Sequence, residues 1–130
     1  NPSIHFQLGH QKDDNFIGIG LYMVSSRQMK LMRDAFYYGF ENINKIIENK
    51  KFKNSWGEMQ GDEYKRYPKD FDPEHPSSKF IQKKQFYFHQ QFTRTEVKSK
   101  DFAQNLVKDL KLAMPYFEWV REVVGTFKKA

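Results

Sequence analysis

Hydrophobic and polar positions alternate in three short stretches of the chain, at residues 4–8, 17–23 and 85–92. Alternation with a period of two is typical of a half-buried β-strand. The first two stretches are separated by a polar segment, residues 9–15, so they predict a β-hairpin. The aromatic stretch at residues 85–92 predicts a third strand.

Two glycines, Gly18 and Gly20, occupy alternate positions of the second predicted strand. Glycine has no side chain to pack, so one face of this strand would be bare. We therefore expect a helix or another backbone segment to approach that face closely.

Apolar residues then recur at spacings of three and four from residue 26 onward. The stripe consists of Met29, Met32, Ala35, Phe36, Phe40, Ile43, Ile46 and Ile47. It predicts one long amphipathic helix that is capped at Ser25 or Ser26 and ends near Lys50. Gly39 inside this helix costs about 1 kcal/mol relative to alanine, which predicts close packing at that point.

A second amphipathic stripe runs through the C-terminal part of the chain. It consists of Phe102, Leu106, Leu110, Ala113, Phe117, Val120 and Val124. We expect this helix to start at Ser99, to bend at Pro115 and to end at Gly125. Thr93 and Glu96 have the spacing of a capping box, which predicts a one-turn helix before it.

The middle of the chain, residues 52–80, has no such period and predicts an irregular loop. Because long structureless segments are uncommon, we expect aromatic side chains to pin it to the core. These are Trp56, Tyr64, Tyr67 and Phe71. Ser77 is expected to cap a short helical turn that runs through Ile81.

The order of these elements predicts an α+β fold, in which a small antiparallel sheet is covered on one face by two long amphipathic helices. The length of 130 residues fits a single domain over residues 1–130. Aromatic residues make up 17% of the chain and supply a large core.

The charge and the cysteine content of the chain exclude some classes of function and permit others. The formal net charge of +6 permits an acidic partner, but the lysines are spread along the chain. The absence of cysteine excludes disulfides, thiolate metal sites and cysteine nucleophiles. No signal peptide is visible, and the longest apolar run, residues 16–24, is far shorter than the ~20 residues of a membrane span. We expect a soluble cytoplasmic protein without membrane contact.

Four segments together resemble the domain-of-unknown-function 2461 family. They read GDEYKRYPKDFDPEHP from Gly61, FIQKKQFYF from Phe80, KSKDF from Lys98 and LAMPYFEWV from Leu112. Asp70 stands where the family usually has a loop glycine, and aspartate tolerates the left-handed conformation. Family members generally carry a further N-terminal segment, so the resemblance implies that residues 1–130 are the C-terminal portion of a larger family domain. The resemblance implies no activity.

The proline-rich loop YPKDFDPEHP, residues 67–76, raises the question of a metal site. Its acids could bind Mg²⁺ or Ca²⁺, but their spacing matches no EF-hand. We instead interpret it as a rigid structural loop without metal or cofactor, braced by hydrogen bonds to the backbone. Its key residues are Pro68, Phe71, Asp72, Pro73, His75 and Pro76.

Two histidines, His5 and His89, lie on predicted strands opposite the aliphatic positions. They could converge as a metal or acid–base pair if their strands are neighbours, although exposure at the surface is the simpler interpretation. Residues 64–69 interleave aromatic and basic side chains, which is also what single-stranded nucleic acid requires.

Motifs for covalent catalysis and phosphate-binding glycine loops are absent. Our first hypothesis is therefore a non-catalytic binding or interaction module, whose N-terminal hairpin edge contacts a protein partner or a second subunit. The alternative is a hydrolase or phosphate-handling enzyme with a pocket built near Tyr64, Arg66, His75 and His89. A second alternative is nucleic-acid binding through the basic aromatic face.

Overall fold

A computed structural model describes residues 1–9 and 15–125 of the chain. One antiparallel sheet contains strands in the order β1-β2-β3. The strands are β1 (Ser3–Gln7), β2 (Phe16–Leu21) and β3 (Phe86–Gln91). The α+β class and the three predicted strands are confirmed. Residues 10–14 of the predicted hairpin turn lie outside the described residues.

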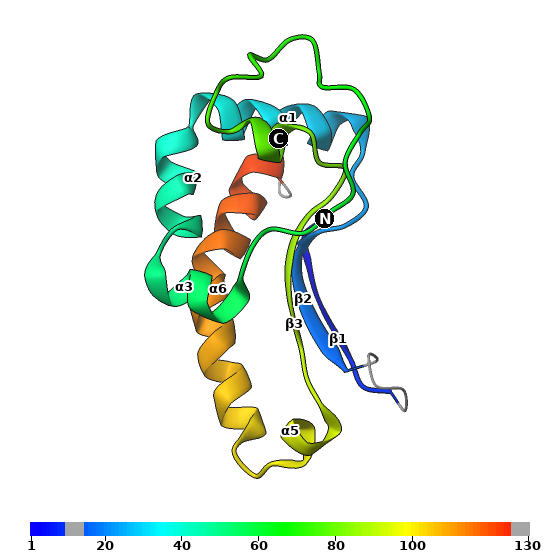
Figure 1. Cartoon of the computed structure of the whole chain (residues 1–130), viewed down its shortest axis with the longest axis vertical. Helices are drawn as coiled ribbons and strands as arrows, with labels where there is room; N and C mark the ends of the chain where they lie inside the picture. Colours follow the sequence, from blue (N-terminus) through cyan, green and yellow to red (C-terminus); the bar gives the residue numbers. More distant parts are fainter. Residues whose placement is uncertain (10–14, 126–130) are drawn as a thin grey trace.

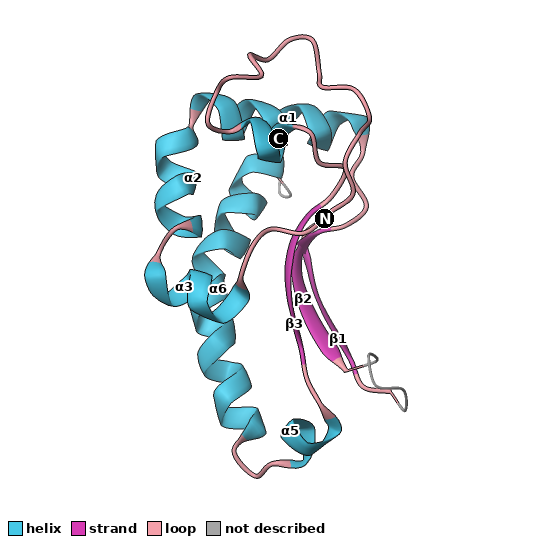
Figure 2. Ribbon diagram, viewed as in Figure 1, coloured by secondary structure: helices cyan, strands magenta, loops and turns pink. Residues whose placement is uncertain are grey.

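Helices account for most of the remaining regular structure (Figure 2). Within the described residues they are α1 (Ser26–Tyr38), α2 (Phe40–Ile47), α3 (Lys50–Trp56), α4 (Ser78–Ile81), α5 (Arg94–Lys98) and α6 (Phe102–Val124). None of these helices combines the length and the apolar character needed to cross a bilayer.

The prediction of one long helix up to Lys50 was wrong, because α1, α2 and α3 form three segments with different directions (Figure 1). Gly39, with φ −110° and ψ 28°, leaves the helical conformation and separates α1 from α2. Asn49 starts α3 by accepting a hydrogen bond from the Phe52 N–H. The apolar stripe continues through both turns because each segment buries its own face in the same core.

Capping residues behave largely as the sequence indicated. Ser25 forms a capping box with Gln28 at the start of α1, and Thr93 forms one with Glu96 at the start of α5. Gly125 ends α6 in the left-handed conformation, with φ 59° and ψ 53°. The predicted start at Ser99 was wrong, because α6 begins at Phe102.

The sheet has one face buried under helices. Residues Ile17, Ile19, Leu21, Phe86 and Phe88 point to this side and are almost completely buried. They pack against α6 and α3, whereas α1 lies across the end of α6 (Figure 1). Of the two long helices expected over the sheet, α6 is present; the rest of the cover comes from the short α3 and from Phe36 of α1, whose ring lies 5.6 Å from that of Phe86.

Tyr116 of α6 anchors this packing. Its ring is fully buried against Phe88, with ring centroids 4.9 Å apart. Its hydroxyl donates to the Phe86 carbonyl at 3.1 Å, so a buried polar group is satisfied. Because ionisation would place an unpaired charge in the core, burial raises the pKa of Tyr116.

Gly18 and Gly20, the two positions of β2 without a side chain, are approached closely, as predicted. Strand β3 approaches Gly20, and the ring of Tyr22 approaches Gly18. A Cβ placed on Gly20 would lie 2.3 Å from the Phe86 carbonyl oxygen of the neighbouring strand. A Cβ placed on Gly18 would lie 2.0 Å from the hydroxyl of Tyr22, whose side chain therefore covers this glycine.

The irregular segment is shorter than expected, because α3 continues through Trp56. The Trp56 side chain is buried and its Nε1–H donates to the Asp109 carbonyl at 2.8 Å. Tyr67 and Phe71 are half-buried against the core, as predicted for pinning residues. Tyr64 is different, because 40% of it is exposed.

Candidate interaction surface

Strand β1 forms one edge of the sheet and is exposed along its whole length. The alternation predicted that one face of β1 is covered, yet the apolar side chains on that face remain exposed: Ile4 is 46% exposed, Phe6 44% and Leu8, which follows the strand, 54%. These three residues form what we call the β1 row. Among the described residues, no helix packs extensively on β1; Phe6 stacks on Phe102 of α6, with ring centroids 6.5 Å apart.

The direction of the β1 backbone groups follows from the other edge of the sheet. Tyr87 exchanges both of its backbone hydrogen bonds with Gln60, outside β3, so its N–H and C=O point away from β2. Gly20 pairs with Tyr87 across the sheet, so the N–H and C=O groups of Gly20 must point toward β1, where Gly20 faces Ser3. Since the direction alternates from one residue to the next, the N–H and C=O groups of Ile4 and Phe6 point away from β2, to the side where the described residues form no further strand.

Natural edge strands are usually protected by charged residues, prolines or a covering segment. The opposite edge of this sheet is bridged by Gln60 at Tyr87. From Ser3 to Leu8, by contrast, there is no lysine, arginine, acid or proline. Ile4 and Phe6 thus combine an exposed apolar side chain with outward-facing backbone groups, which is the arrangement that pairs with another strand.

On the other face of the sheet, His5, Gly18 and His89 lie in one cross-strand row. The histidines sit on β1 and β3, which are not neighbours, and the Tyr22 side chain covers the glycine between them. Tyr22 also stacks on Tyr87 at 4.5 Å. Burial, and to a smaller extent the nearby Tyr87, raise the pKa of Tyr22 to about 12.

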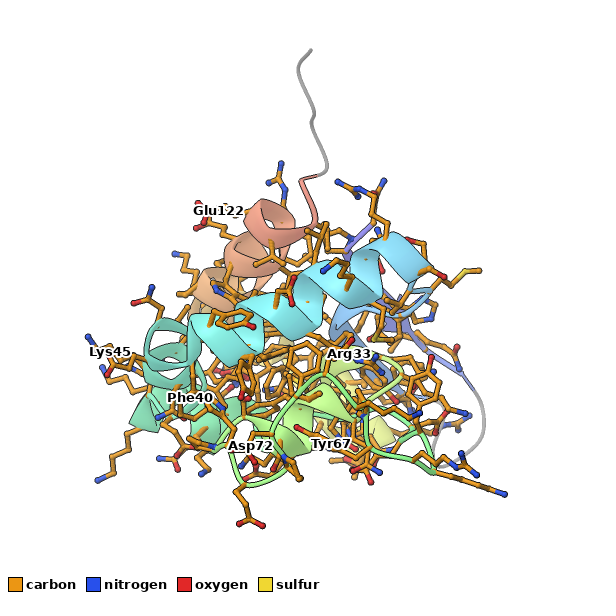
Figure 3. All side chains as sticks on the ribbon, turned by 90° about the horizontal axis from the view of Figure 1, so that it is seen from above. Arg33, Phe40, Lys45, Tyr67, Asp72 and Glu122 are labelled. Atoms are coloured by element: carbon orange, nitrogen blue, oxygen red, sulfur yellow. The ribbon has the colours of Figure 1, made fainter. Side chains whose placement is uncertain are left out.

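The proline-rich loop is held by short-range hydrogen bonds and by aromatic contacts. The Asp72 carboxylate accepts from the Glu74 N–H at 2.9 Å. The His75 ring stacks on Tyr37 at 4.1 Å, and its Nδ1 accepts from the Ser77 N–H at 3.2 Å. Figure 3 shows Tyr67 and Asp72 on this loop, alongside α1.

The predicted role of Ser77 as a capping side chain was wrong. Its buried hydroxyl lies 2.8 Å from His75 Nδ1, and it makes no capping hydrogen bond to α4. No group of three or more histidine, aspartate or glutamate side chains within residues 1–9 and 15–125 could hold a metal ion.

Tyr64 lines an open hollow of about 540 Å³ between α1 and the loop. The Arg33 guanidinium and the Lys84 ammonium lie 5.4 and 5.2 Å from the centre of its ring. The Arg33 Nε–H also donates to the Ile81 carbonyl at 3.0 Å, which ties α1 to α4 (Figure 3).

The four residues of the hypothetical enzyme pocket lie in different surroundings. Tyr64 belongs to the hollow beside α1, and His75 lines a separate one with Tyr37 and Phe40. His89 lies on the sheet face beside Tyr87, at a ring distance of 6.2 Å. Arg66 is exposed on the loop.

Comparison with known proteins places the chain in a family. The model of a family described as a conserved hypothetical protein, DUF2461, matches residues 1–119 of the 130 residues. The chain belongs to the DUF2461 family. No curated protein and no solved structure matches it. Within this DUF2461 domain the matched region includes the β1 row, the proline-rich loop and most of α6.

Two features of this surface escaped the sequence interpretation. Exposure of the β1 row cannot be read from alternation, because a period of two shows that the two faces differ but not whether either is covered. Tyr22 was not singled out, although a tyrosine two residues after Gly20 can fold back over a strand that carries glycines.

Proposed function

We propose that this DUF2461 domain is a non-catalytic interaction module that binds an extended strand of a partner protein along β1. The observation that supports the proposal most strongly is the β1 row itself. Ile4 and Phe6 present exposed apolar side chains together with outward-facing backbone groups. In strand addition, main-chain hydrogen bonds provide affinity, and alternate side chains provide specificity.

The chemistry of the partner follows from this edge and from the charge of the chain. A strand that pairs with β1 would place apolar side chains at alternate positions, beside Ile4, Phe6 and Leu8 on the same face of the sheet. The chain carries a net charge of +6, so a neutral or acidic partner is favoured. A second copy would bring the same positive charge, and we therefore assign the edge to a different protein.

The alternative functions have weaker support. An enzyme pocket needs its polar groups to converge, whereas Tyr64, His75 and His89 lie in different surroundings. Single-stranded nucleic acid needs free ring faces for stacking. Two cations already lie over the Tyr64 ring, which reduces its use as a stacking platform.

A strand peptide tests the proposal directly. The probe is a fluorescent nine-residue peptide with alternating valine and threonine and a glutamate at each end. We expect fluorescence anisotropy to show binding to the wild-type chain. The double variant Ile4→Lys/Phe6→Lys should weaken it about tenfold or more, since charged edge residues oppose strand pairing. The same peptide with a central proline, which lacks an N–H, should bind much more weakly.

The matched control is Ser3→Lys/Gln7→Lys. It adds the same charge to the same strand, but on the other face and at positions whose backbone groups point to β2. This variant should keep most of the affinity. Equal losses in the two double variants, or equal binding of the proline peptide, would refute strand addition. A dimeric wild-type chain in light scattering would refute the assignment to a different protein.

A further inference from the structure

A second surface lies on the helical side of the molecule, away from the hairpin. Helices α2, α3 and α6 surround a hollow of about 330 Å³ there. Three lysines from these three helices line it, Lys45, Lys51 and Lys111, and we call it the lysine hollow. Figure 3 shows Lys45 projecting from α2 on the side opposite the hairpin.

The interior of the lysine hollow is apolar. Ile46 and Leu112 are half-buried hydrophobic residues on its wall, and the core residue Phe52 also lines it. An apolar interior with a few polar groups at the rim is the usual construction of a binding site. Its volume is at the lower end of the range for such sites, so it fits one anchoring side chain.

Within the described part of the chain, none of the three rim lysines forms an ion pair. The acids in ion pairs are Asp34, Glu48, Glu58 and Glu63, and none of them is paired with a lysine of the hollow. Glu48 and Glu58 both contact Lys53 instead. Three cations around an apolar interior are complementary to a ligand that carries several carboxylates and an apolar group.

Besides the three lysines and the apolar wall, the lining of the hollow includes Pro115. It lies inside α6 and lines the hollow next to Lys111. Because proline has no N–H, the carbonyl of Lys111, four residues earlier, lacks its helical donor. A carbonyl without its helical donor can accept an N–H from a bound ligand. A peptide backbone offers such a donor, whereas a fatty acid has carboxylate and apolar groups but no N–H.

We propose that the lysine hollow binds an acidic peptide segment of a partner protein, anchored by one aliphatic side chain. The carboxylates of the segment contact Lys45, Lys51 and Lys111, and the anchor enters between Ile46 and Leu112. A backbone N–H of the segment donates to the Lys111 carbonyl. This binding site is separate from the β1 row and does not depend on strand addition.

The probe is a fluorescent peptide with one central leucine between two pairs of glutamates. We expect the variant Lys45→Glu/Lys111→Glu to weaken its binding about tenfold or more. The matched control, Lys65→Glu/Lys69→Glu, makes the same change of charge on the exposed loop and should cost about twofold at most. A peptide with glycine in place of leucine should bind about fivefold more weakly or worse.

The variant Pro115→Ala distinguishes an effect on peptide binding from an effect on stability. It restores an N–H inside α6, so the thermal midpoint should rise, while the affinity for the leucine peptide should fall about fivefold.

Equal losses from the two lysine variants, or no effect of the leucine, would overturn the proposal. Binding of decanoate or of phosphatidylserine vesicles in place of the peptide would also overturn it. The strand peptide and the Ile4→Lys/Phe6→Lys variant report on β1 alone, so the two proposals can fail separately.

Discussion

Replacing Gly20 with alanine is expected to destabilise the fold by about 3 kcal/mol or more. Gly20 has a φ of +139°, a conformation that residues with a side chain rarely adopt. The new Cβ would also lie 2.3 Å from the Phe86 carbonyl oxygen and 2.7 Å from the Tyr87 Cα. Both are backbone atoms of β3, so the clash can be relieved only by moving strands apart.

Two other glycines serve as controls in urea unfolding experiments. Gly57 also has a positive φ, of 71°, but a Cβ there meets no atom within 4 Å, so Gly57→Ala should cost only about 1 kcal/mol. At Gly18 the obstacle is the Tyr22 hydroxyl, which belongs to a side chain. The double variant Gly18→Ala/Tyr22→Phe should therefore be more stable than Gly18→Ala alone. Equal costs at Gly20 and Gly57 would contradict the close approach of β2 and β3.

Loss of stability at alkaline pH is the second large effect that we expect. Burial raises the pKa of Tyr22 to about 12, from an ordinary value of 10.0, and also raises the pKa of Tyr116. A raised pKa means that the folded state holds these protons more tightly than the unfolded state. The stability that they contribute is complete below pH 10 and is lost above it. The loss is up to about 1.4 kcal/mol per pH unit for the buried Tyr116 and smaller for the half-buried Tyr22, whose charge water screens.

The ultraviolet absorbance of tyrosinate, followed together with circular dichroism, measures this effect. The chain has seven tyrosines, and Tyr22 and Tyr116 should ionise after most of the others, Tyr116 only as the chain unfolds. The double variant Tyr22→Phe/Tyr116→Phe should lose the late part of the absorbance change. Ionisation of all seven tyrosines near pH 10 with unchanged circular dichroism would show that the two rings are not buried.

Local sequence signals predicted local structure well. The capping boxes at Ser25 and Thr93 and the end of α6 at Gly125 depend on neighbouring residues, and all three are present. Gly39 shows where such signals become ambiguous. A glycine within an apolar stripe fits both a strained helix and a turn between two helices, because the stripe does not change in either case.

Features that depend on distant parts of the chain could not be predicted. The exposure of Ile4 and Phe6 results from the position of α6, which packs against β2 and β3 and contacts β1 through the ring pair of Phe6 and Phe102. Ser77 has the composition of a cap, but its hydroxyl is taken by His75. The lysine hollow joins three helices and has no signature in any one segment.

Amide hydrogen exchange of β1, measured by NMR with and without the strand peptide, tests the central claim most directly. In the free chain, the amides of Ile4 and Phe6 should exchange rapidly, because they point outward, while those of Ser3, His5 and Gln7 face β2. Addition of the valine–threonine peptide should slow exchange at Ile4 and Phe6 specifically. Rapid exchange at these two amides in the presence of saturating peptide would contradict strand addition at β1.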